Sequence, residues 1–170
     1  MGPPNEDSIE FARVVDRGIR SSKIVDLKKF KLDDEHVLMM FTDLYVLDYD
    51  GNLFDTGALA AMAAIMTARL PKIEIENEKH KIIWGEYAGK LEYSDLVVDS
   101  TFSMIGDKIL IDPSSHEQKG MDAGMVVSTV GENICTLQKL GREGLTKDQI
   151  LQMVDIAFDK AKELKTHLKQ

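Results

Sequence analysis

Several kinds of functional chemistry are almost unrepresented in this sequence. Its only cysteine is Cys135, which excludes an intrachain disulfide framework and a multi-cysteine zinc site and fits a reducing compartment. No apolar run approaches the roughly 18 residues needed to span a bilayer, and the N-terminus lacks the basic and apolar regions of a signal peptide. We therefore expect a soluble, cytoplasmic protein without a membrane partner.

Motifs of the common catalytic and metal sites are also missing. There is no G-x-S-x-G, P-loop or G-x-G-x-x-G pattern. The four histidines are spread along the chain without the spacing of metal ligands: His36, His80, His116 and His167. Cys135 lies in an apolar stretch and is interpreted as a buried, inert thiol. We expect no metal ion and no cofactor.

One acidic segment resembles a calcium loop only in part. It gathers side-chain oxygens at four positions: Asp48, Asp50, Asn52 and Asp55. A calcium loop counted from Asp48 requires glycine at its sixth position and glutamate at its twelfth, where this chain has Leu53 and Leu59. We interpret the segment as a turn followed by a helix cap.

The remaining composition is that of an ordinary globular protein. The 170 residues are 44% apolar and 29% charged, which excludes disordered and low-complexity classes, and they suffice for one domain or two closely fused halves. The 21 basic residues against 29 acidic ones give a net charge of −8, so the chain as a whole does not attract a polyanion. A free-standing nucleic-acid binder is disfavoured.

Hydrophobic periodicity predicts helices and strands in a mixed order. We predict a helix over residues 9–22 with Asp7 or Ser8 as its N-cap, a long central strand over 37–47, and a buried, alanine-rich helix over 55–70 closed by Pro71. Residues 74–92 are charged and irregular, and are predicted to form an exposed excursion.

The second half of the chain is predicted to be rich in strands. They are expected over residues 94–105, 108–112, 125–130 and 134–140, the last two as a hairpin. Thr146 and Gln149 form a capping box that opens a long amphipathic C-terminal helix. The order indicates an α+β fold.

The first helix carries the most informative local pattern. Arg13, Arg17 and Arg20 gather on one side of it, opposite its apolar face. Three guanidinium groups one helical turn apart could hold successive phosphates of a nucleic-acid strand. The alternative is a solvated face with Asp16 and Glu10 as local partners, which the pattern alone favours.

The opening segment, residues 2–20 (GPPNEDSIEFARVVDRGIR), resembles the stretch that begins the second half of RNase PH-type domains. It is most similar to the non-catalytic RNase PH-like subunit of the archaeal exosome ring. The resemblance continues through residues 48–53, the helix over 57–66, the segment Ile111-Asp112-Pro113-Ser114 and the closing helix. It implies an RNase PH-like α+β fold of a phosphorolytic 3′-to-5′ exoribonuclease family.

The resemblance also implies which catalytic groups are lost. In active relatives the loop after the central strand reads D-A-D-G-G-T-R, and its arginine holds the attacking phosphate. That arginine position is Phe54 here, and the threonine before it is Leu53. The aspartate that supports the transition state in active relatives corresponds to Gly124, with Asp122 two residues earlier. Phenylalanine supplies no cation for a phosphate nucleophile, so we expect no catalytic residue in this chain.

The resemblance reverses the interpretation of the basic helix. Arg13 and Arg17 match positions of the inactive branch that line the RNA path, so we expect Arg13, Arg17 and Arg20 to bind single-stranded RNA. The implied function is a non-catalytic, RNA-path subunit, with a catalytic RNase PH-like paralogue in an alternating hexameric ring and RNA cap subunits as partners. An active phosphorolytic nuclease using Asp122 and a small interaction module without an RNA role remain alternatives.

The expected domains follow from the same resemblance. Residues 1–72 correspond to the remainder of the first RNase PH subdomain, a ribosomal protein S5 domain 2-like half, and residues 73–170 to the RNase PH C-terminal subdomain. Family members carry further strands before the Gly2-Pro3-Pro4 motif, so we expect an N-terminally truncated chain. Its exposed strand edges and apolar surface are expected to favour self-association.

Overall fold

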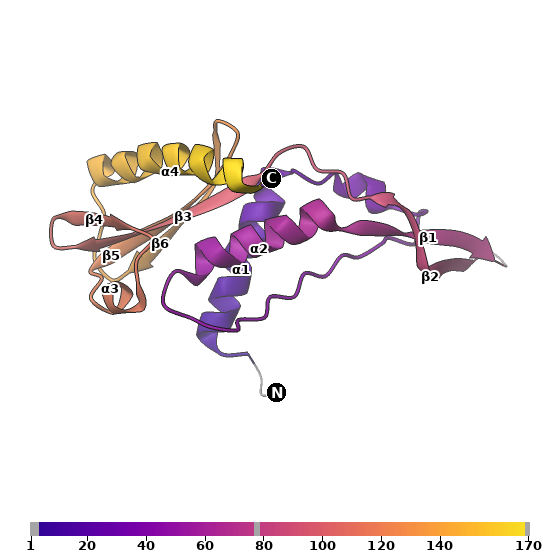
Figure 1. Ribbon diagram of the computed structural model, residues 1–170, viewed down its shortest axis with the longest axis horizontal. Helices are drawn as coiled ribbons and strands as arrows, with labels where there is room; N and C mark the ends of the chain where they lie inside the picture. Colours follow the sequence, from indigo (N-terminus) through magenta and orange to yellow (C-terminus); the bar gives the residue numbers. More distant parts are fainter. Residues whose placement is uncertain (1–3, 77–78, 169–170) are drawn as a thin grey trace.

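The computed structural model describes residues 4–76 and 79–168, and within them the predicted α+β fold is confirmed (Figure 1). Gly2 and Pro3 of the opening motif, and two residues of the charged 74–92 stretch, lie outside this part of the chain. A four-stranded antiparallel sheet and a separate two-stranded hairpin account for the strands. Helices pack on both faces of the larger sheet.

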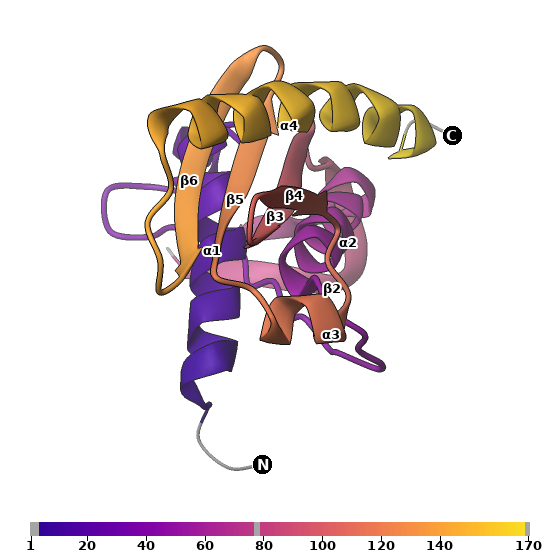
Figure 2. The ribbon, with the colours of Figure 1, turned by 90° about the vertical axis from the view of Figure 1, so that its left-hand side faces the viewer.

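The larger sheet has the strand order β4-β3-β5-β6. Its strands are β3 (Val97–Ile105), β4 (Lys108–Ile111), β5 (Ala123–Val130) and β6 (Asn133–Gly141). Helix α4 (Lys147–Leu168) covers one face, while α1 (Glu6–Ser22) and α2 (Leu53–Thr67) pack on the other (Figure 2). The predicted hairpin between the last two strands is confirmed, because β5 pairs with β6.

Strand β3 is the centre of the packing and is buried on both sides. Phe102 and Met104 point toward α4 and pack with Met153 and Ala157. The alternate residues face α1 and α2 and include the buried polar side chains of Asp99, Thr101 and Ser103. The sheet therefore has an apolar face under α4 and a partly polar face under α1 and α2.

Helix α1 begins earlier than predicted because Asn5, and not Asp7 or Ser8, is its N-cap. The Asn5 side chain accepts a hydrogen bond of 2.8 Å from the Ser8 backbone N–H. Helix α1 packs closely against α2 at Gly57. A Cβ atom at Gly57 would lie 2.4 Å from the Phe11 ring.

The prediction that Pro71 closes the alanine-rich helix was wrong. Helix α2 ends at Thr67, and Ala68 at its C-terminus already has an extended backbone. Pro71 instead lies in strand β1 (Arg69–Glu76) at a break in the pairing register. A β-bulge tolerates proline because ladder hydrogen bonds are interrupted there.

The predicted central strand over residues 37–47 was also wrong. Apart from a single bridge between Lys31 and Val37, no residue of this segment pairs with a strand in the described part of the chain. Most of its large apolar side chains are exposed, above all those of Phe41, Tyr45 and Leu47. Strand-forming side chains do not make a strand without a neighbour whose N–H and C=O groups complete the ladder.

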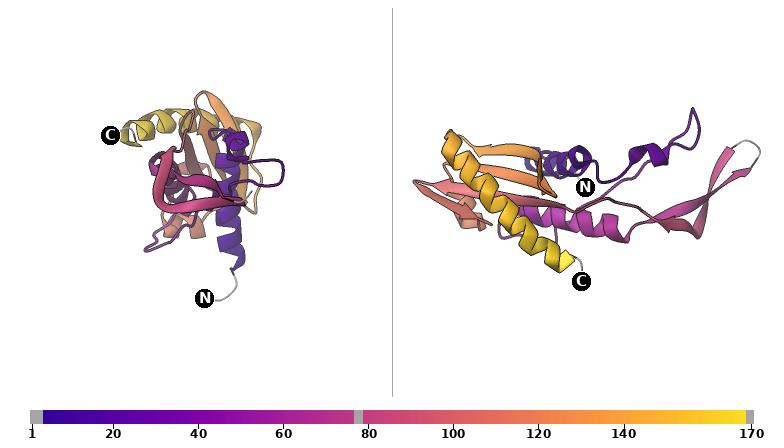
Figure 3. Two further views of the ribbon diagram at one scale, coloured as in Figure 1. Left: turned by 90° about the vertical axis from the view of Figure 1, so that its right-hand side faces the viewer. Right: turned by 90° about the horizontal axis from the view of Figure 1, so that it is seen from above.

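Residues 74–92 were predicted to be irregular, and this was wrong as well. Most of them form an antiparallel hairpin in which β1 pairs with β2 (Lys79–Lys90). The expected exposure holds, since the hairpin projects from the rest of the chain and its strands contact chiefly each other (Figures 1 and 3). The many charges lie on exposed faces of the hairpin, where they form pairs such as Lys72 with Glu86 at 2.9 Å.

The acidic segment over residues 48–55 forms the predicted turn and helix cap. Asn52 is the N-cap of α2, and the turn lies against the short helix α3 (Ser115–Lys119). Asp50 accepts hydrogen bonds from the Ser115 backbone N–H at 3.0 Å and from its hydroxyl at 2.8 Å. The Tyr49 hydroxyl donates to Gln118 Oε1 at 2.8 Å. This contact joins the N-terminal helices to the C-terminal sheet.

The predicted capping box of the last helix is confirmed. The Thr146 backbone N–H donates to Gln149 Oε1 at 2.8 Å, and Thr146 Oγ1 accepts from the Gln149 backbone N–H at 3.3 Å. Helix α4 is long, but its exposed side is charged. Among the residues described, no helix combines the length and apolar character needed to cross a membrane.

Candidate nucleic-acid interface

The three arginines of α1 are positioned differently by the fold. Arg13 is exposed, and among the described residues no hydrogen-bond or ion-pair partner is found for its side chain. Arg17 is half-buried and donates from Nη1 to Gln138 Oε1 of β6 at 2.9 Å. Arg20 is exposed and pairs with Asp16 at 3.0 Å, one helical turn away.

The alternative of a solvated, locally paired face therefore holds for Arg20 and not for the other two. Glu10 was the second residue expected to pair with an arginine. Its carboxylate instead accepts a hydrogen bond from the Gln138 side-chain amide at 3.4 Å. Arg13 is available to a ligand, and Arg17 is held in place by a neutral partner that leaves its charge uncompensated. A phosphate backbone passing along α1 would meet these two guanidinium groups first.

Phe54, at the position where the family resemblance places a phosphate-binding arginine, belongs to the packing between the first two helices. Its ring lies 6.3 Å from the ring of Phe11, centroid to centroid, at an interplanar angle of 49°. This separation is typical of a stabilising aromatic pair. The side chain offers no donor and no charge at this position.

Gly124, at the position where the family resemblance places a catalytic aspartate, lies in the closely packed part of β5. A Cβ atom there would lie 2.5 Å from the Phe102 carbonyl oxygen of the neighbouring strand and 2.5 Å from Met121 Sδ. The nearby Asp122 is exposed, and its Oδ2 accepts a hydrogen bond of 2.9 Å from the Gly106 backbone N–H. Its carboxylate thus holds the turn between β3 and β4.

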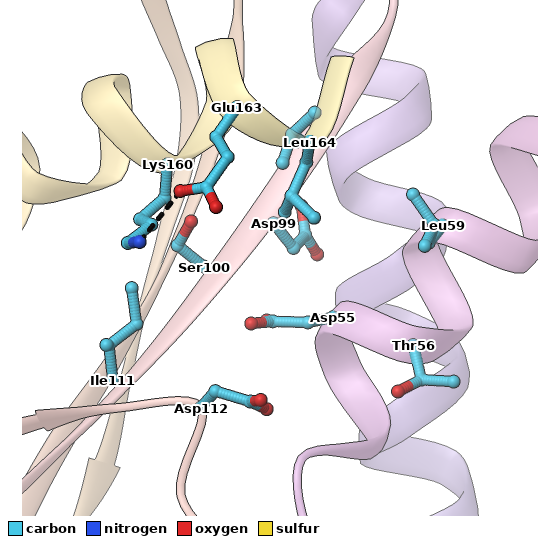
Figure 4. Close-up of a pocket in the computed structure, with 11 residues that line it drawn as sticks. Asp55, Thr56, Leu59, Asp99, Ser100, Ile111, Asp112, Lys160, Glu163 and Leu164 are labelled. Atoms are coloured by element: carbon cyan, nitrogen blue, oxygen red, sulfur yellow. Dashed lines mark hydrogen bonds and ion pairs between the residues drawn. The ribbon is translucent and has the colours of Figure 1, made fainter. Parts of the chain in front are cut away.

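A cavity of about 380 Å³ lies between α2, β3 and α4 (Figure 4). Four carboxylates line it: Asp55, Asp99, Asp112 and Glu163. The one lysine in its lining, Lys160, is already paired with Glu163 at 2.8 Å. Because the only lysine of the lining is paired, the cavity offers no free cation to a phosphate nucleophile or an RNA backbone.

Asp55 is anchored within this cavity by a hydrogen-bond network. It accepts from the Thr101 backbone N–H at 2.9 Å and from the Thr101 hydroxyl at 2.6 Å. The Asn52 amide donates to Asp55 at 2.8 Å and to Asp112 at 2.7 Å. Burial nevertheless raises the pKa of Asp55 above its ordinary value, because these bonds only partly replace water. The network fixes the start of α2 on β3.

Asp99 is the least satisfied polar group in the described part of the chain. Both of its carboxylate oxygens are buried without a hydrogen-bond partner, and Oδ1 lies beneath Gly18 of α1. The nearby Ser128 hydroxyl is engaged with Thr136 at 3.1 Å. Burial raises the pKa of Asp99 to about 7, with the negative charge of Asp55 adding to the rise and Ser128 opposing it.

Sequence reasoning found the arginine face but missed two groupings that only the fold creates. Asp99 lies in a strand of small polar and apolar residues. Nothing in that pattern predicts that its carboxylate is buried without a hydrogen-bond partner. His36 and His80 are distant in sequence but lie together with Asp33, because the hairpin brings them there. Cys135 is half-buried rather than buried, and burial raises its pKa to about 11, which keeps it a thiol as expected.

The sheet and the helices on its two faces define an α+β protein. Two family profiles match the sequence. Residues 1–71 match "3' exoribonuclease family, domain 1", and residues 95–160 match "3' exoribonuclease family, domain 2". The chain belongs to this family.

Relatives of the chain include archaeal exosome components. The chain is 40% identical to the exosome complex component Rrp42 of Methanothermobacter thermautotrophicus over 98% of its own length and 62% of the relative's. It is 39% identical to the Rrp42 of Thermococcus gammatolerans, over 96% of the chain and 61% of the relative. The chain thus spans somewhat less than two thirds of the length of these relatives.

Solved structures agree with this relationship. A chain of a structure titled "Archaeal exosome core" superimposes with a TM-score of 0.83 at 35% identity, over 98% of this chain and 65% of that one. A chain of the Archaeoglobus fulgidus exosome "with RNA bound to the active site" gives a TM-score of 0.77 at 34% identity, over 98% and 63% of the two chains. At these identities the likeness extends beyond the fold to the sequence itself.

Proposed function

We propose that this chain is a non-catalytic subunit of an exosome-type ring that holds single-stranded RNA on the α1 face while a catalytic RNase PH-like paralogue degrades it phosphorolytically from the 3′ end. The observation that carries the proposal is the pairing of Phe54 with Phe11 at the family's phosphate-binding position. A phosphate nucleophile needs a fixed cation, whereas Phe54 carries no charge and packs between the two helices. The acidic cavity nearby supplies no substitute.

The similarity to Rrp42 proteins supports the ring context. Those relatives are exosome components, and one solved neighbour has RNA bound. In the proposed ring, Arg13 and Arg17 hold RNA phosphates without reading the bases, and Arg20 adds to the field once RNA competes for its pairing with Asp16. Cap subunits and the catalytic paralogue are the proposed partners, and the cytoplasm is the proposed compartment.

Charge reversal of the arginine face is expected to weaken RNA binding by the reconstituted ring. Each of Arg13→Glu and Arg17→Glu should lower affinity by roughly tenfold, the loss of one charge-assisted contact. Each should also lower the slope of log affinity against log salt by about 1, alike for all RNA sequences. Fluorescence anisotropy with two unrelated RNA oligonucleotides at several salt concentrations measures both quantities.

The matched control reverses a charge on the opposite face of the sheet. Lys162 on α4 is exposed and pairs with Asp159 at 3.3 Å, as Arg20 pairs with Asp16. Lys162→Glu should leave RNA binding unchanged. A loss confined to one RNA sequence, or an equal loss in Lys162→Glu, would argue against phosphate contacts on the α1 face. Unchanged RNA binding in both Arg13→Glu and Arg17→Glu would favour an interaction module without an RNA role.

The second candidate function, an active nuclease using Asp122, is tested without the paralogue. We expect no phosphate-dependent shortening of a labelled RNA by the chain alone, and no change on Asp122→Ala, because this carboxylate is bonded to the β3–β4 turn. The same assay on the reconstituted ring is the positive control. Phosphate-dependent trimming by the chain alone that is abolished in Asp122→Ala would overturn the non-catalytic assignment.

A further inference from the structure

A compact cluster of Asp33, His36 and His80 lies outside the arginine face and outside the acidic cavity. His36 Nδ1 lies 3.0 Å from each Asp33 carboxylate oxygen, and His80 Nε2 lies 2.6 Å from Asp33 Oδ2. One ligand atom from each of the three residues falls within 4.8 Å of the other two. The two imidazole rings meet edge to face with their centroids 5.3 Å apart.

The backbone holds the carboxylate of this cluster in place. Asp33 Oδ1 accepts hydrogen bonds from the backbone N–H groups of Glu35 at 2.8 Å and His36 at 2.7 Å. The loop is closed by the bridge between Lys31 and Val37. One carboxylate oxygen is therefore used to fix the loop, and Oδ2 remains directed toward His80.

Two imidazole nitrogens and one carboxylate oxygen are a favourable ligand set for zinc and similar divalent transition metals. Metal–ligand bonds of about 2.0–2.2 Å in tetrahedral geometry place neighbouring ligand atoms about 3.3 Å apart. Since the Asp33 contacts now measure 2.6 and 3.0 Å, each of these two contacts would need to lengthen by less than about 1 Å to admit an ion. Three protein ligands leave a fourth position for water.

The cluster joins the outer part of the β1–β2 hairpin to the loop over residues 31–37. His80 lies toward the far end of the β1–β2 hairpin, where it is paired with Ile75. Asp33 and His36 belong to the loop after the short helix η1 (Leu27–Phe30), which extends toward the hairpin (Figure 3). Because β1 and β2 pack chiefly against each other, a bond from His80 to this loop restrains the hairpin.

We propose that Asp33, His36 and His80 bind one divalent transition-metal ion of the zinc class, and that this ion fastens the projecting hairpin to the loop over residues 31–37. The ion has a structural role and stands apart from the RNA-binding proposal. The expectation of no metal site rested on the absence of ligand spacing in sequence, and the fold supplies that proximity instead.

Metal binding is tested with Co²⁺ as a spectroscopic probe and Zn²⁺ as a competitor, on the untagged, chelator-treated full chain. We expect saturation at one equivalent per chain, with visible d–d absorption that Zn²⁺ abolishes. His36→Gln and His80→Gln should weaken binding by at least about 100-fold. Loss of a residue that only hydrogen-bonds to a metal ligand already costs up to about 100-fold in affinity, and these variants remove a ligand itself. His116→Gln and His167→Gln, which alter histidines outside the cluster, should bind as the wild type does.

Asp33→Asn keeps an oxygen for the Glu35 and His36 backbone N–H groups, so it removes the ligand charge while the loop remains closed. Its loss of Co²⁺ binding, with an unchanged circular dichroism spectrum, would support the site even if a histidine variant folds poorly. Zn²⁺ should also slow amide hydrogen exchange in β2 of the wild type and not of Asp33→Asn. Absence of a saturable site, or its survival in both His80→Gln and Asp33→Asn, would overturn the proposal.

Discussion

An Asp99→Asn protein is expected to be about 3 kcal/mol more stable than the wild type at pH 8 and to differ from it by less than about 1 kcal/mol at pH 4. The wild-type carboxyl is buried without a hydrogen-bond partner, and burial raises its pKa from 3.8 to about 7. A shift of this size corresponds to about 4 kcal/mol at most, since each pKa unit is worth 1.36 kcal/mol.

The direction follows from where protons are bound. Between pH 4 and 7 the folded protein keeps a proton on Asp99 that the unfolded chain releases, so the wild type loses stability as pH rises through this range. Asparagine is neutral throughout and resembles the protonated acid in shape. The Cys135 thiol, with a pKa of about 11, stays protonated throughout this range. The negative charge of Asp55 contributes to the raised pKa of Asp99, so removing the Asp99 charge also removes this repulsion.

Urea unfolding of both proteins at several pH values between 4 and 8 measures the difference. The control is Asp107→Asn, which neutralises an exposed aspartate near Lys108 and should change stability by no more than about 0.5 kcal/mol at any pH. A stability difference that stays constant from pH 4 to pH 8 would show that Asp99 does not titrate in this range.

Gly51→Ala is expected to destabilise the protein by about 3–5 kcal/mol, which combines backbone strain with an unrelieved clash. Gly51 has a φ of +103°, a conformation that L side chains rarely adopt. A Cβ atom there would lie 2.4 Å from the Pro113 carbonyl oxygen and 2.6 Å from the Ser115 backbone nitrogen. Backbone atoms cannot rotate away, so the turn must separate from α3 and give up the bonds between Asp50 and Ser115.

The control for strain without a clash is Gly106→Ala. Gly106 also has a positive φ, of +59°, but a Cβ atom added there would have no atom within 4 Å beyond its chain neighbours. Its substitution should cost about 1–2 kcal/mol, from backbone strain alone. Thermal and urea unfolding compare the two variants, and equal losses would show that the contact between the turn and α3 adds nothing to stability.

Local signals in the sequence were sufficient to predict an element whose backbone hydrogen bonds lie within the element itself. The last helix was predictable because Thr146 and Gln149 cap it within the segment itself. The segment over residues 37–47 was not predictable in the same way, because a strand exists only where a neighbour completes its ladder. The β1–β2 hairpin was missed for the opposite reason: its charges suggested a loop, while each strand supplies the partner of the other.

In the candidate site, too, features within one helix were predictable and contacts between distant segments were not. The arginine face was predictable, since three positions on one helix share a side whatever the helix packs against. The pairing of Arg20 with Asp16, one helical turn away, was predictable in the same way. That Arg17 donates to Gln138 could not be predicted, since this contact depends on how β6 approaches α1. The clusters around Asp99 and His80 depend on contacts between distant segments, which no spacing rule describes.

The two unlike faces of β3 bear on how faithfully the sheet is assembled. A slip of β3 by one residue against β5 would turn Asp99, Thr101 and Ser103 toward the apolar side chains of α4 and would direct Phe102 toward Asp55. Each misregistered pairing would bury several polar groups without partners. The polar side chains beneath α1 and α2 thus penalise wrong alignments more than they strengthen the right one, and help a strand buried on both faces to select a single register.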